Sequence, residues 1–542
     1  MATPTMLTSI LLLFFFFTIP LTRSLSFLSA RTATEHCNGT LYPDLCVSTL
    51  TAIPYRGSPK SLPDIISSAI GHTESTVNST AAGLRRMRRS RIALDARQRL
   101  ALADCLELLD ETVTDLDRAT ADLARHASSN LDDLRTVLSA AITNQYTCLD
   151  GFSHVDHNRS IRPLIQNEMF NISHLVSNSL AMAKKIPPKN ESRSNQVFDG
   201  YGTIVKGFPK WLSAEDQALL LADGTTADLV VAKDGTGHFT TVADAVAAAP
   251  NKSAKRFVIY IKQGAYFENI EVVKHKTNLM FICDGIEKTL IKASRNVVDG
   301  WTTYSSATVA VVGNGFLARD LTIENGAGPS KHQAVALRSN SDLSAFYRCR
   351  FVGYQDTLYV HSQRQFYREC EVYGTVDFVF GNAAVVLQKC SLFARRPDPK
   401  QKNIFTAQGR EDPNENTGIS IQQCKLAAAA DLVPVQAEFK TYLGRPWKMY
   451  SRTVIMQSNI GGLVDPAGWL EWDGDFALST LYYGEYMNTG AGSSTKDRVK
   501  WPGYRVIGSA TEAERFTVGS FIQGDQWLAQ TTFPFTGGLA AS

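Results

Sequence analysis

Four side chains capable of chemistry recur at nearly constant spacing in the second half of the chain. Gln333 and Gln355 are 22 residues apart, and Asp356 and Asp377 are 21 residues apart. A period of about 21 residues is typical of a right-handed parallel β-helix, in which like positions of successive coils stack about 4.8 Å apart. Stacked in this way, the two carboxylates and two amides share one face. Such a set can supply an acid, a base or a nucleophile together with hydrogen-bond donors.

Aromatic residues flank the same positions and favour a sugar-binding face, because sugars stack on such rings. They are Tyr354, Tyr359, Phe378 and Phe380. A structural interpretation stays open for each of the four polar residues, since an Asp or Gln in a β-helix can cap a turn or form a ladder. The chain has no Gly-x-Ser-x-Gly segment, which argues against a serine esterase. The Gly-rich segment 234–237 is not a phosphate loop, because no Gly-Lys-Ser/Thr follows it.

The residue types and their pattern after about residue 226 agree with a β-helix. Short β-branched and aromatic runs alternate with Gly, Asn and Asp, and they predict strands at 257–261, 308–312, 334–337 and 453–456. One short helix is predicted at 242–249. A β-sandwich also has short strands, but it does not align side chains 21 residues apart.

The first region, residues 31–186, has the period of amphipathic helices instead. Apolar residues recur at three- and four-residue steps within 94–125, and segments 61–90, 130–153 and 160–185 behave similarly. Four such stretches with short breaks predict an antiparallel four-helix bundle. We therefore expect a multidomain protein, with an all-α four-helix bundle, a polar linker at 187–225 and an all-β domain at 226–542. A short amphipathic helix is expected within the linker at 211–223.

The N-terminus predicts secretion. An apolar run from Ile10 to Pro20 is too short to span a bilayer, and small residues follow it, so residues 1–24 are interpreted as a signal peptide. A retained signal anchor is the alternative, since no Lys or Arg precedes the run. Six Asn-x-Ser/Thr sequons agree with secretion and are the predicted glycosylation sites. They are Asn38, Asn78, Asn158, Asn171, Asn190 and Asn251.

The nine cysteines include no Cys-x-x-Cys, so neither a metal site nor a redox site is predicted. In a secreted chain they predict disulfides. Three connectivities are open to the first four, and Cys37–Cys46 with Cys105–Cys148 is favoured. Cys349 and Cys370 lie one coil apart, close enough to pair at a Cα separation near ~5.5 Å. The net charge of +3 is too small for a nucleic-acid binder but suits an acidic polymer.

Five segments, in order, resemble the signature segments of plant pectin methylesterases. They are Gly264–Glu268, Gln333–Arg338, Tyr354–Tyr359, Asp377–Gly381 and Leu443–Trp447. The resemblance runs from residue 226 to about 535, while the N-terminal half resembles the pectin methylesterase inhibitor domain. It implies a secreted, monomeric cell-wall enzyme without cofactor that hydrolyses the methyl esters of homogalacturonan. Separate inhibitor proteins are the implied partners, and neither nucleic acid nor, once the signal is removed, a membrane is expected.

The resemblance also implies a role for each residue of the site. Asp377 would be the nucleophile that forms an acyl-enzyme, and Arg445 would hold it charged and aimed. Asp356 would act first as acid and then as base. Gln333 and Gln355 would donate hydrogen bonds to the oxyanion. The implied substrate-binding residues are Thr303, Gln333, Tyr359, Phe380, Arg445, Trp447 and Trp469.

The same resemblance implies which of the remaining cysteines form a disulfide. It implies a bridge between Cys390 and Cys424, which leaves Cys283 as the free thiol. The segment 216–220 departs from the family, because it reads Asp-Gln-Ala-Leu-Leu where relatives often carry a basic pair before Leu-Leu. Removal of the helical half is therefore an open question.

Two other functions stay open at this point. A β-helix glycosidase or lyase would need a retaining or inverting carboxylate pair, or calcium-binding acids. An inhibitory or wall-binding protein would act through its helical half alone. If that half acts on its own esterase, as autoinhibitor or chaperone, it should lie across the sugar cleft near Trp447 and Trp469.

Overall fold

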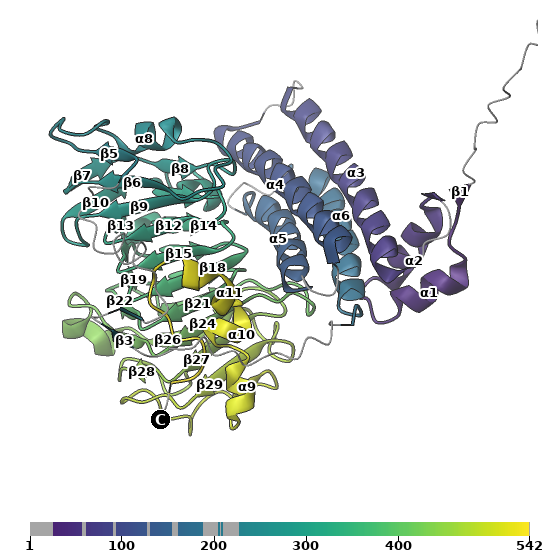
Figure 1. Ribbon diagram of the computed structural model, residues 1–542. Helices are drawn as coiled ribbons and strands as arrows, with labels where there is room; N and C mark the ends of the chain where they lie inside the picture. Colours follow the sequence, from purple (N-terminus) through teal and green to yellow (C-terminus); the bar gives the residue numbers. More distant parts are fainter. Residues whose placement is uncertain are drawn as a thin grey trace, which may run out of the picture.

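The computed structural model describes residues 25–56, 61–89, 94–126, 131–153, 161–187, 204–205, 208–209 and 227–540. A bundle of long helices lies beside a stack of short parallel strands (Figure 1). The predicted signal peptide, the predicted helix at 211–223, nearly all of the linker and the sequons Asn158 and Asn190 lie outside these residues. Within the described part of the chain, no helix is both long and apolar enough to cross a membrane.

The four predicted helices are confirmed. They are α3 (Leu62–Arg89), α4 (Ala96–His126), α5 (Leu131–Asp150) and α6 (Arg162–Ala183). Their apolar faces meet in one core, in which Ile66, Leu102 and Val137 are fully buried. Two short helices, α1 (Ala30–Cys37) and α2 (Pro43–Ala52), precede the bundle, with the strand pair β1 (Leu25–Ser26) and β2 (Tyr55–Arg56).

Both favoured disulfides of the helical half are present. Cys37–Cys46 joins α1 to α2, and Cys105–Cys148 joins α4 to α5. Because the second bridge closes a loop of 43 residues, it removes much of the freedom that the unfolded segment would otherwise have. The C-terminal end of α5, which carries Cys148, is thereby fixed against the middle of the bundle.

The predicted parallel β-helix is confirmed, and its coils are made of three parallel sheets. The first sheet has eleven strands: β5 (Leu229–Val231), β6 (Phe257–Ile261), β9 (Leu279–Cys283), β12 (Leu317–Arg319), β15 (Ser344–Tyr347), β18 (Arg364–Arg368), β21 (Ala384–Gln388), β24 (Gly418–Gln422), β27 (Arg452–Met456), β29 (Tyr482–Tyr486) and β30 (Tyr504–Val506). The second has eight: β7 (Gly264–Phe267), β10 (Thr289–Ala293), β13 (Thr322–Asn325), β16 (Arg350–Val352), β19 (Glu371–Gly374), β22 (Ser391–Ala394), β25 (Lys425–Ala428) and β28 (Asn459–Ile460).

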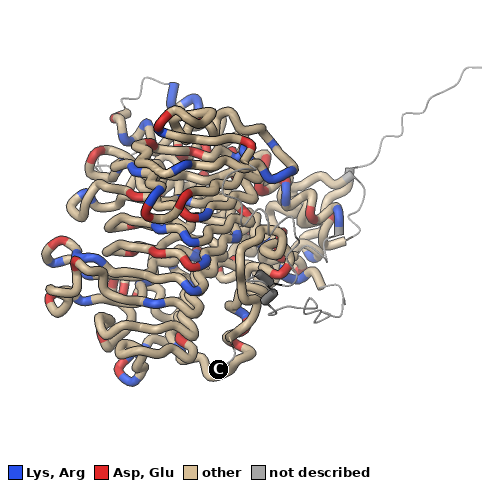
Figure 2. The backbone as a smooth tube through the Cα atoms, turned by 60° about the vertical axis from the view of Figure 1, so that its left-hand side comes forward, with Lys and Arg blue, Asp and Glu red and all other residues tan. Residues whose placement is uncertain are grey.

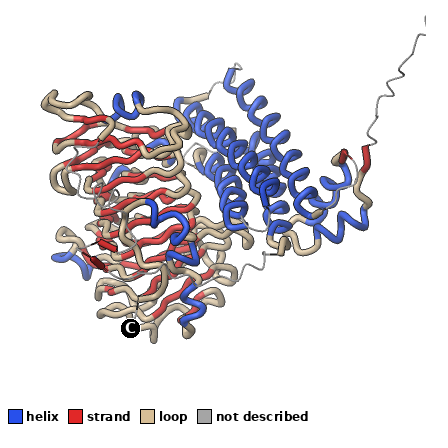
Figure 3. The backbone as a smooth tube through the Cα atoms, in the orientation of Figure 1, coloured by secondary structure: helices blue, strands red, loops and turns tan. Residues whose placement is uncertain are grey.

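The third sheet faces the helices, and it positions the site described below. Its seven strands are β8 (Ile270–Val272), β11 (Val309–Val311), β14 (Leu337–Ser339), β17 (Leu358–Val360), β20 (Val379–Gly381), β23 (Asn403–Gln408) and β26 (Thr441–Pro446). The predicted strand at 334–337 therefore begins only at Leu337. Figure 3 shows α4 and α5 between this sheet and the rest of the bundle.

Smaller elements flank the stack, and the C-terminal helices pack on the side of the first sheet. The predicted helix at 242–249 is confirmed as α8 (Val242–Ala248), which packs on the first coils. The short helices α9 (Ala510–Glu514), α10 (Val518–Phe521) and α11 (Gly524–Trp527) follow the last coil, and a separate hairpin joins β3 (Ile204–Val205) to β4 (Phe208–Pro209). Acidic and basic residues are interspersed along the coils (Figure 2), in keeping with the small net charge.

The predicted disulfides of the β-helix are wrong, because Cys349, Cys370, Cys390 and Cys424 are buried free thiols. They occupy one register position in four successive coils. In-register strands keep the Cα–Cβ bonds parallel, so each sulfur lies against the backbone of a neighbouring coil rather than opposite another sulfur. The N–H of Cys370 donates to Sγ of Cys390 at 3.4 Å, and the Cys390 N–H donates to Sγ of Cys424 at 3.3 Å. The four cysteines thus form a ladder of thiols, and Cys283 is a fifth, separate free thiol.

We therefore expect five cysteines to react with an alkylating reagent when the protein is unfolded without reductant. Mass spectrometry of the tryptic peptides should find the label on Cys283, Cys349, Cys370, Cys390 and Cys424, and none on the four cysteines of the helical half. Reduction before alkylation is the control that labels all nine. Label on Cys283 alone would restore the two bridges that the sequence suggested.

Candidate active site

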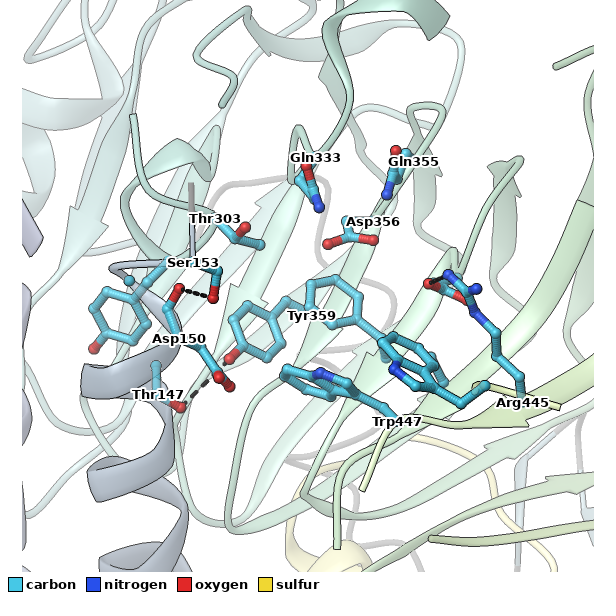
Figure 4. A pocket seen from close by; sticks show the side chains of 16 residues that line it. Thr147, Asp150, Ser153, Thr303, Gln333, Gln355, Asp356, Tyr359, Arg445 and Trp447 are labelled. Atoms are coloured by element: carbon cyan, nitrogen blue, oxygen red, sulfur yellow. Dashed lines mark hydrogen bonds and ion pairs between the residues drawn. The ribbon is translucent and has the colours of Figure 1, made fainter. Parts of the chain in front are cut away.

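The polar residues predicted from the coil period come together on the face of the third sheet. A cavity of about 270 Å³ is lined by Thr303, Gln333, Gln355, Asp356, Tyr359, Asp377, Phe380, Arg445 and Trp447, among others. Gln333, Gln355, Asp356 and Asp377 lie in the turns that lead into β14, β17 and β20, one coil above another (Figure 4). Nine of the ten residues that the family resemblance assigned to the site line this one cavity.

The register of the third sheet explains why these residues meet. Arg338, Tyr359, Phe380, Ala407 and Arg445 are successive partners on β14, β17, β20, β23 and β26. Since side chains at the same register position point the same way, this row forms an outward-facing floor. The turns preceding β17 and β20 then place the two aspartates beside that floor.

Arg445 and Asp377 form a bidentate ion pair. Nε of Arg445 donates to Oδ1 of Asp377 at 2.8 Å, and Nη2 donates to Oδ2 at 2.5 Å. Asp377 is only 5% exposed, so its charge depends on this partner. The planar guanidinium also fixes the carboxylate plane, because both oxygens are held at once.

Asp356 lies one coil from Asp377 and is similarly buried. Burial raises the pKa of Asp356 well above its usual value, the charge of Asp377 raises it further, and Arg445 offsets only part of this. The two carboxyl groups therefore differ in environment: burial favours the protonated form of Asp356, whereas Asp377 is paired with arginine. Both residues adopt left-handed backbone conformations, with φ of 64° and 51°, which Asp tolerates better than most residues.

The two amides complete the polar side of the cavity. Figure 4 shows Gln333 and Gln355 with their side chains directed towards Asp356. Oε1 of Gln333 is buried and has no hydrogen-bond partner in the described part of the chain. Two NH2 groups above a carboxylate can donate to an oxygen that develops negative charge between them.

Aromatic rings form the opposite wall. Tyr359 stacks on Phe380 with ring centroids 4.2 Å apart, and Phe380 meets Trp447 edge-on at 6.0 Å. The guanidinium of Arg445 lies over the ring of Trp472 at 4.2 Å. A flat apolar surface beside convergent polar groups is the arrangement of a sugar-binding site.

Trp469 does not line the cavity, contrary to the role that the resemblance implied. It is 1% exposed, stacks on Tyr483 at 4.2 Å and donates from Nε1 to Glu485 at 3.2 Å. Trp472, three residues further on and 36% exposed, lines the cavity instead. Both tryptophans lie in an irregular turn, where no period indicates which ring faces outwards. Tyr304 is a further lining residue that the sequence did not single out.

The helical half supplies one side of the same cavity. Thr147, Asp150, Gly151 and Ser153, at and just beyond the end of α5, line it together with the residues of the β-helix. Oγ1 of Thr147 lies 3.5 Å from the hydroxyl of Tyr359, a contact marked in Figure 4. These residues were not predictable as part of the site, because they reach it only through the docking of two domains.

Acidic residues of α4 extend the contact between the halves. Hydroxyl groups of Thr302 and Ser305 donate to Asp104 at 2.5 and 2.6 Å. Likewise, the amides of Asn340 and Gln363 donate to Glu111 at 3.1 Å and to Asp115 at 2.9 Å. Burial raises the pKa of these acids above their usual values, to about 7 for Asp104, about 8 for Glu111 and about 7 for Asp115.

Comparison with known proteins gives two family matches. The profile of the pectinesterase family matches residues 228–525, and that of the plant invertase/pectin methylesterase inhibitor family matches residues 32–182. Pectinesterase 1 of Citrus sinensis is 53% identical over 514 residues, 93% of this chain and 88% of that protein. Pectinesterase/pectinesterase inhibitor 3 of Arabidopsis thaliana is 49% identical over 547 residues, 95% of this chain and 92% of that protein.

A solved structure resembles the β-helix half by itself. The pectin methylesterase from carrot is 62% identical and superposes with a TM-score of 0.58. The match covers 59% of this chain and 100% of the carrot chain. The whole of that solved chain therefore aligns with the β-helix half.

Proposed function

The chain belongs to the pectinesterase family and is a pectin methylesterase with an inhibitor-like N-terminal domain; we propose that Asp377, Asp356, Gln333, Gln355 and Arg445 carry its hydrolysis of methyl esters. The observation that supports these roles most strongly is the pairing of one arginine-held carboxylate with one buried, protonated carboxyl group under two amides. We also propose residues 31–186 and 226–542 as the bounds of the two domains, which the family matches support.

In the first step, Asp377 attacks the C6 carbonyl carbon of a methyl galacturonate. A carboxylate is a weak nucleophile, and the bidentate grip of Arg445 compensates by aiming it. The carbonyl oxygen becomes an oxyanion, to which Gln333 and Gln355 donate. One such donor is typically worth about 3–4 kcal/mol in the transition state.

The tetrahedral intermediate then expels methoxide, and protonated Asp356 gives it the proton that makes methanol. This leaves an anhydride between C6 and Asp377, with Asp356 now ionised. Asp356 next takes a proton from water as the hydroxyl adds to C6. The C6–O bond to Asp377 breaks, which frees the galacturonate carboxyl and restores both aspartates. The net reaction consumes one ester and one water, and it yields one acid and one methanol.

A glycosidase or lyase mechanism fits this site less well. A glycosidase passes through an oxocarbenium-like transition state that gains positive charge, whereas Gln333 and Gln355 present amide donors suited to an oxyanion. Within the described residues, no group of three or more His, Cys, Asp or Glu side chains is arranged to hold a metal ion.

We further propose that the enzyme is secreted to the cell wall, as expected of a plant pectinesterase. Four of the six predicted glycosylation sites, Asn38, Asn78, Asn171 and Asn251, are exposed, so that glycans could be attached there without disturbing the fold. The two disulfides of the helical half agree with passage through an oxidising compartment.

The helical half is proposed to inhibit its own esterase by covering the catalytic cavity. The end of α5 lies in the cavity, and α4 crosses the neighbouring coils with its acids bound by the β-helix. A polymer could not lie in the cleft while the bundle occupies it. Tethering supplies an effective concentration on the order of millimolar, so even a weak contact would keep the uncut chain inactive.

Asp377→Asn should lower methanol release from methylated pectin at least about 1,000-fold, because the amide cannot act as nucleophile. Its near-identical shape should leave the fold intact, which circular dichroism and thermal unfolding of the 226–542 fragment would show. Asp497→Asn in the same fragment, at an exposed position, is the control for an Asp-to-Asn change. Activity of the Asp377 variant above a few per cent of wild type would remove Asp377 from its role.

The full 25–542 chain should release methanol from polymeric pectin at least about tenfold more slowly than the 226–542 fragment, at equal concentrations of folded protein. The difference should be larger at pH 5 than at pH 8. Asp104, Glu111 and Asp115 have pKa values of about 7 to 8 when docked, so docking is favoured at low pH and weakens as they ionise. Equal rates at both pH values would leave the helical half only a role in folding or trafficking.

A further inference from the structure

Lys448 follows Trp447 directly, at the edge of the catalytic cavity. Its side chain is only 15% exposed, and its Nζ lies 3.3 Å from Oδ2 of Asp150 and 3.2 Å from Oε1 of Glu411. The rings of Trp447 and Tyr146 surround the ammonium, with centroids at 5.1 and 5.3 Å. A cation that is nearly buried beside an active site needs a specific reason to be there.

The two carboxylates at Lys448 come from different halves of the protein. Glu411 belongs to the β-helix and remains beside Lys448 whatever the helical half does. Asp150 is the last residue of α5, and it lines the same cavity as Asp377 and Arg445. An ammonium group has three N–H donors, so it can serve Glu411 and a second acid together. When the helical half leaves, Asp150 and Tyr146 leave with it, and Lys448 keeps only Glu411 of its two acidic partners.

The substrate can supply that second acid. A pectin chain carries C6 as a methyl ester on some units and as a free carboxylate on others. A unit next to the one being hydrolysed would place its own C6 group a short distance along the cleft. There Trp447 offers an apolar ring to a sugar face, and Lys448 offers a charge to a carboxylate.

We propose that Lys448 binds the free C6 carboxylate of a galacturonate unit adjacent to the methyl ester in the pocket, and that Asp150 occupies this carboxylate subsite in the uncut chain. The inference rests on the proposed function and specifies the substrate further. Lys448 then selects for esters that have an ionised neighbour, and the helical half blocks the site by presenting a carboxylate of its own. Asp150 and Glu411 outweigh the effect of burial and hold the pKa of Lys448 above its usual value, so the ammonium is charged in the docked state.

Two oligogalacturonates of equal length test the subsite on the 226–542 fragment, which corresponds to the solved chain of the carrot enzyme. One carries a single methyl ester between free acids, and the other is fully methylated. Lys448→Met should lower the ratio of kcat/KM for the first over the second about tenfold. Lys448→Arg, which keeps the positive charge, should keep most of this ratio. Lys425 is an exposed lysine of β25 on another sheet, and Lys425→Met should leave the ratio unchanged. Hexagalacturonate as the free acid should inhibit wild type competitively, with its Ki about tenfold higher in Lys448→Met.

The outcomes separate this inference from the proposed function. If the wild-type fragment releases no methanol from either oligomer, the proposed function fails. If it releases methanol, yet Lys448→Met changes neither the ratio nor the Ki of hexagalacturonate, the carboxylate subsite is refuted. Circular dichroism of each variant checks that it is folded. The ratio of kcat/KM for the two oligomers, measured on one sample, does not depend on the fraction of folded protein.

The role of Asp150 in blocking the subsite is tested in the full chain. Asp150→Asn should raise methanol release from polymeric pectin severalfold, because the helical half loses its charge pair with Lys448 while the subsite stays intact. Asp117→Asn, exposed on α4, is the matched control and should leave the rate of the full chain unchanged. Equal rates for the two variants would show that Asp150 does not hold the subsite closed.

Discussion

Arg445 reaches Asp377 across the intervening strand β23, and this contact settles how charge is distributed in the whole cavity. Two carboxyl groups one coil apart cannot both ionise cheaply in a buried place. The guanidinium holds both oxygens of Asp377, so the proton of the pair resides on Asp356. From this one asymmetry follow a nucleophile that is charged and an acid that still has a proton to give. The parallel register of the third sheet brings Asp356, Asp377 and Arg445 together on successive coils.

The contact with the helical half obeys the same electrostatic logic. A cleft that receives an acidic polymer must offer donors and cations to carboxylates, and the helical half presents carboxylates to those groups. Asp104, Glu111 and Asp115 accept hydrogen bonds from the β-helix, while Asp150 pairs with Lys448. Burial of these acids requires them to be paired or protonated, which couples the docking of the two halves to pH.

Much of this could be predicted from the sequence, because a β-helix repeats. The period of about 21 residues aligned Asp356 with Asp377, and five short segments carried the family resemblance. The errors arose where no period applies. Trp469 and Trp472 share one irregular turn, so their sequence does not say which ring faces the cavity. The disulfide prediction for the β-helix was wrong for a different reason. Equal spacing along the chain brings the cysteines close together, but their sulfur atoms do not point towards one another. The parts that Thr147 and Asp150 play depend on the docking of two domains, which neither domain's sequence encodes alone.

The protonation of the aspartate pair is the most direct test of the central claim. Carbon-13 NMR of the 226–542 fragment labelled at the aspartate carboxyl groups would follow both residues from pH 3 to pH 9, with Asp356→Asn and Asp377→Asn providing the assignments. The carboxyl of Asp356 should stay protonated well above the usual pKa of about 4. In Asp377→Asn the pKa of Asp356 should fall, because the neighbouring negative charge is gone and Arg445 remains. An Asp356 that ionises near its usual pKa beside an ionised Asp377 would contradict the division of roles between the two aspartates.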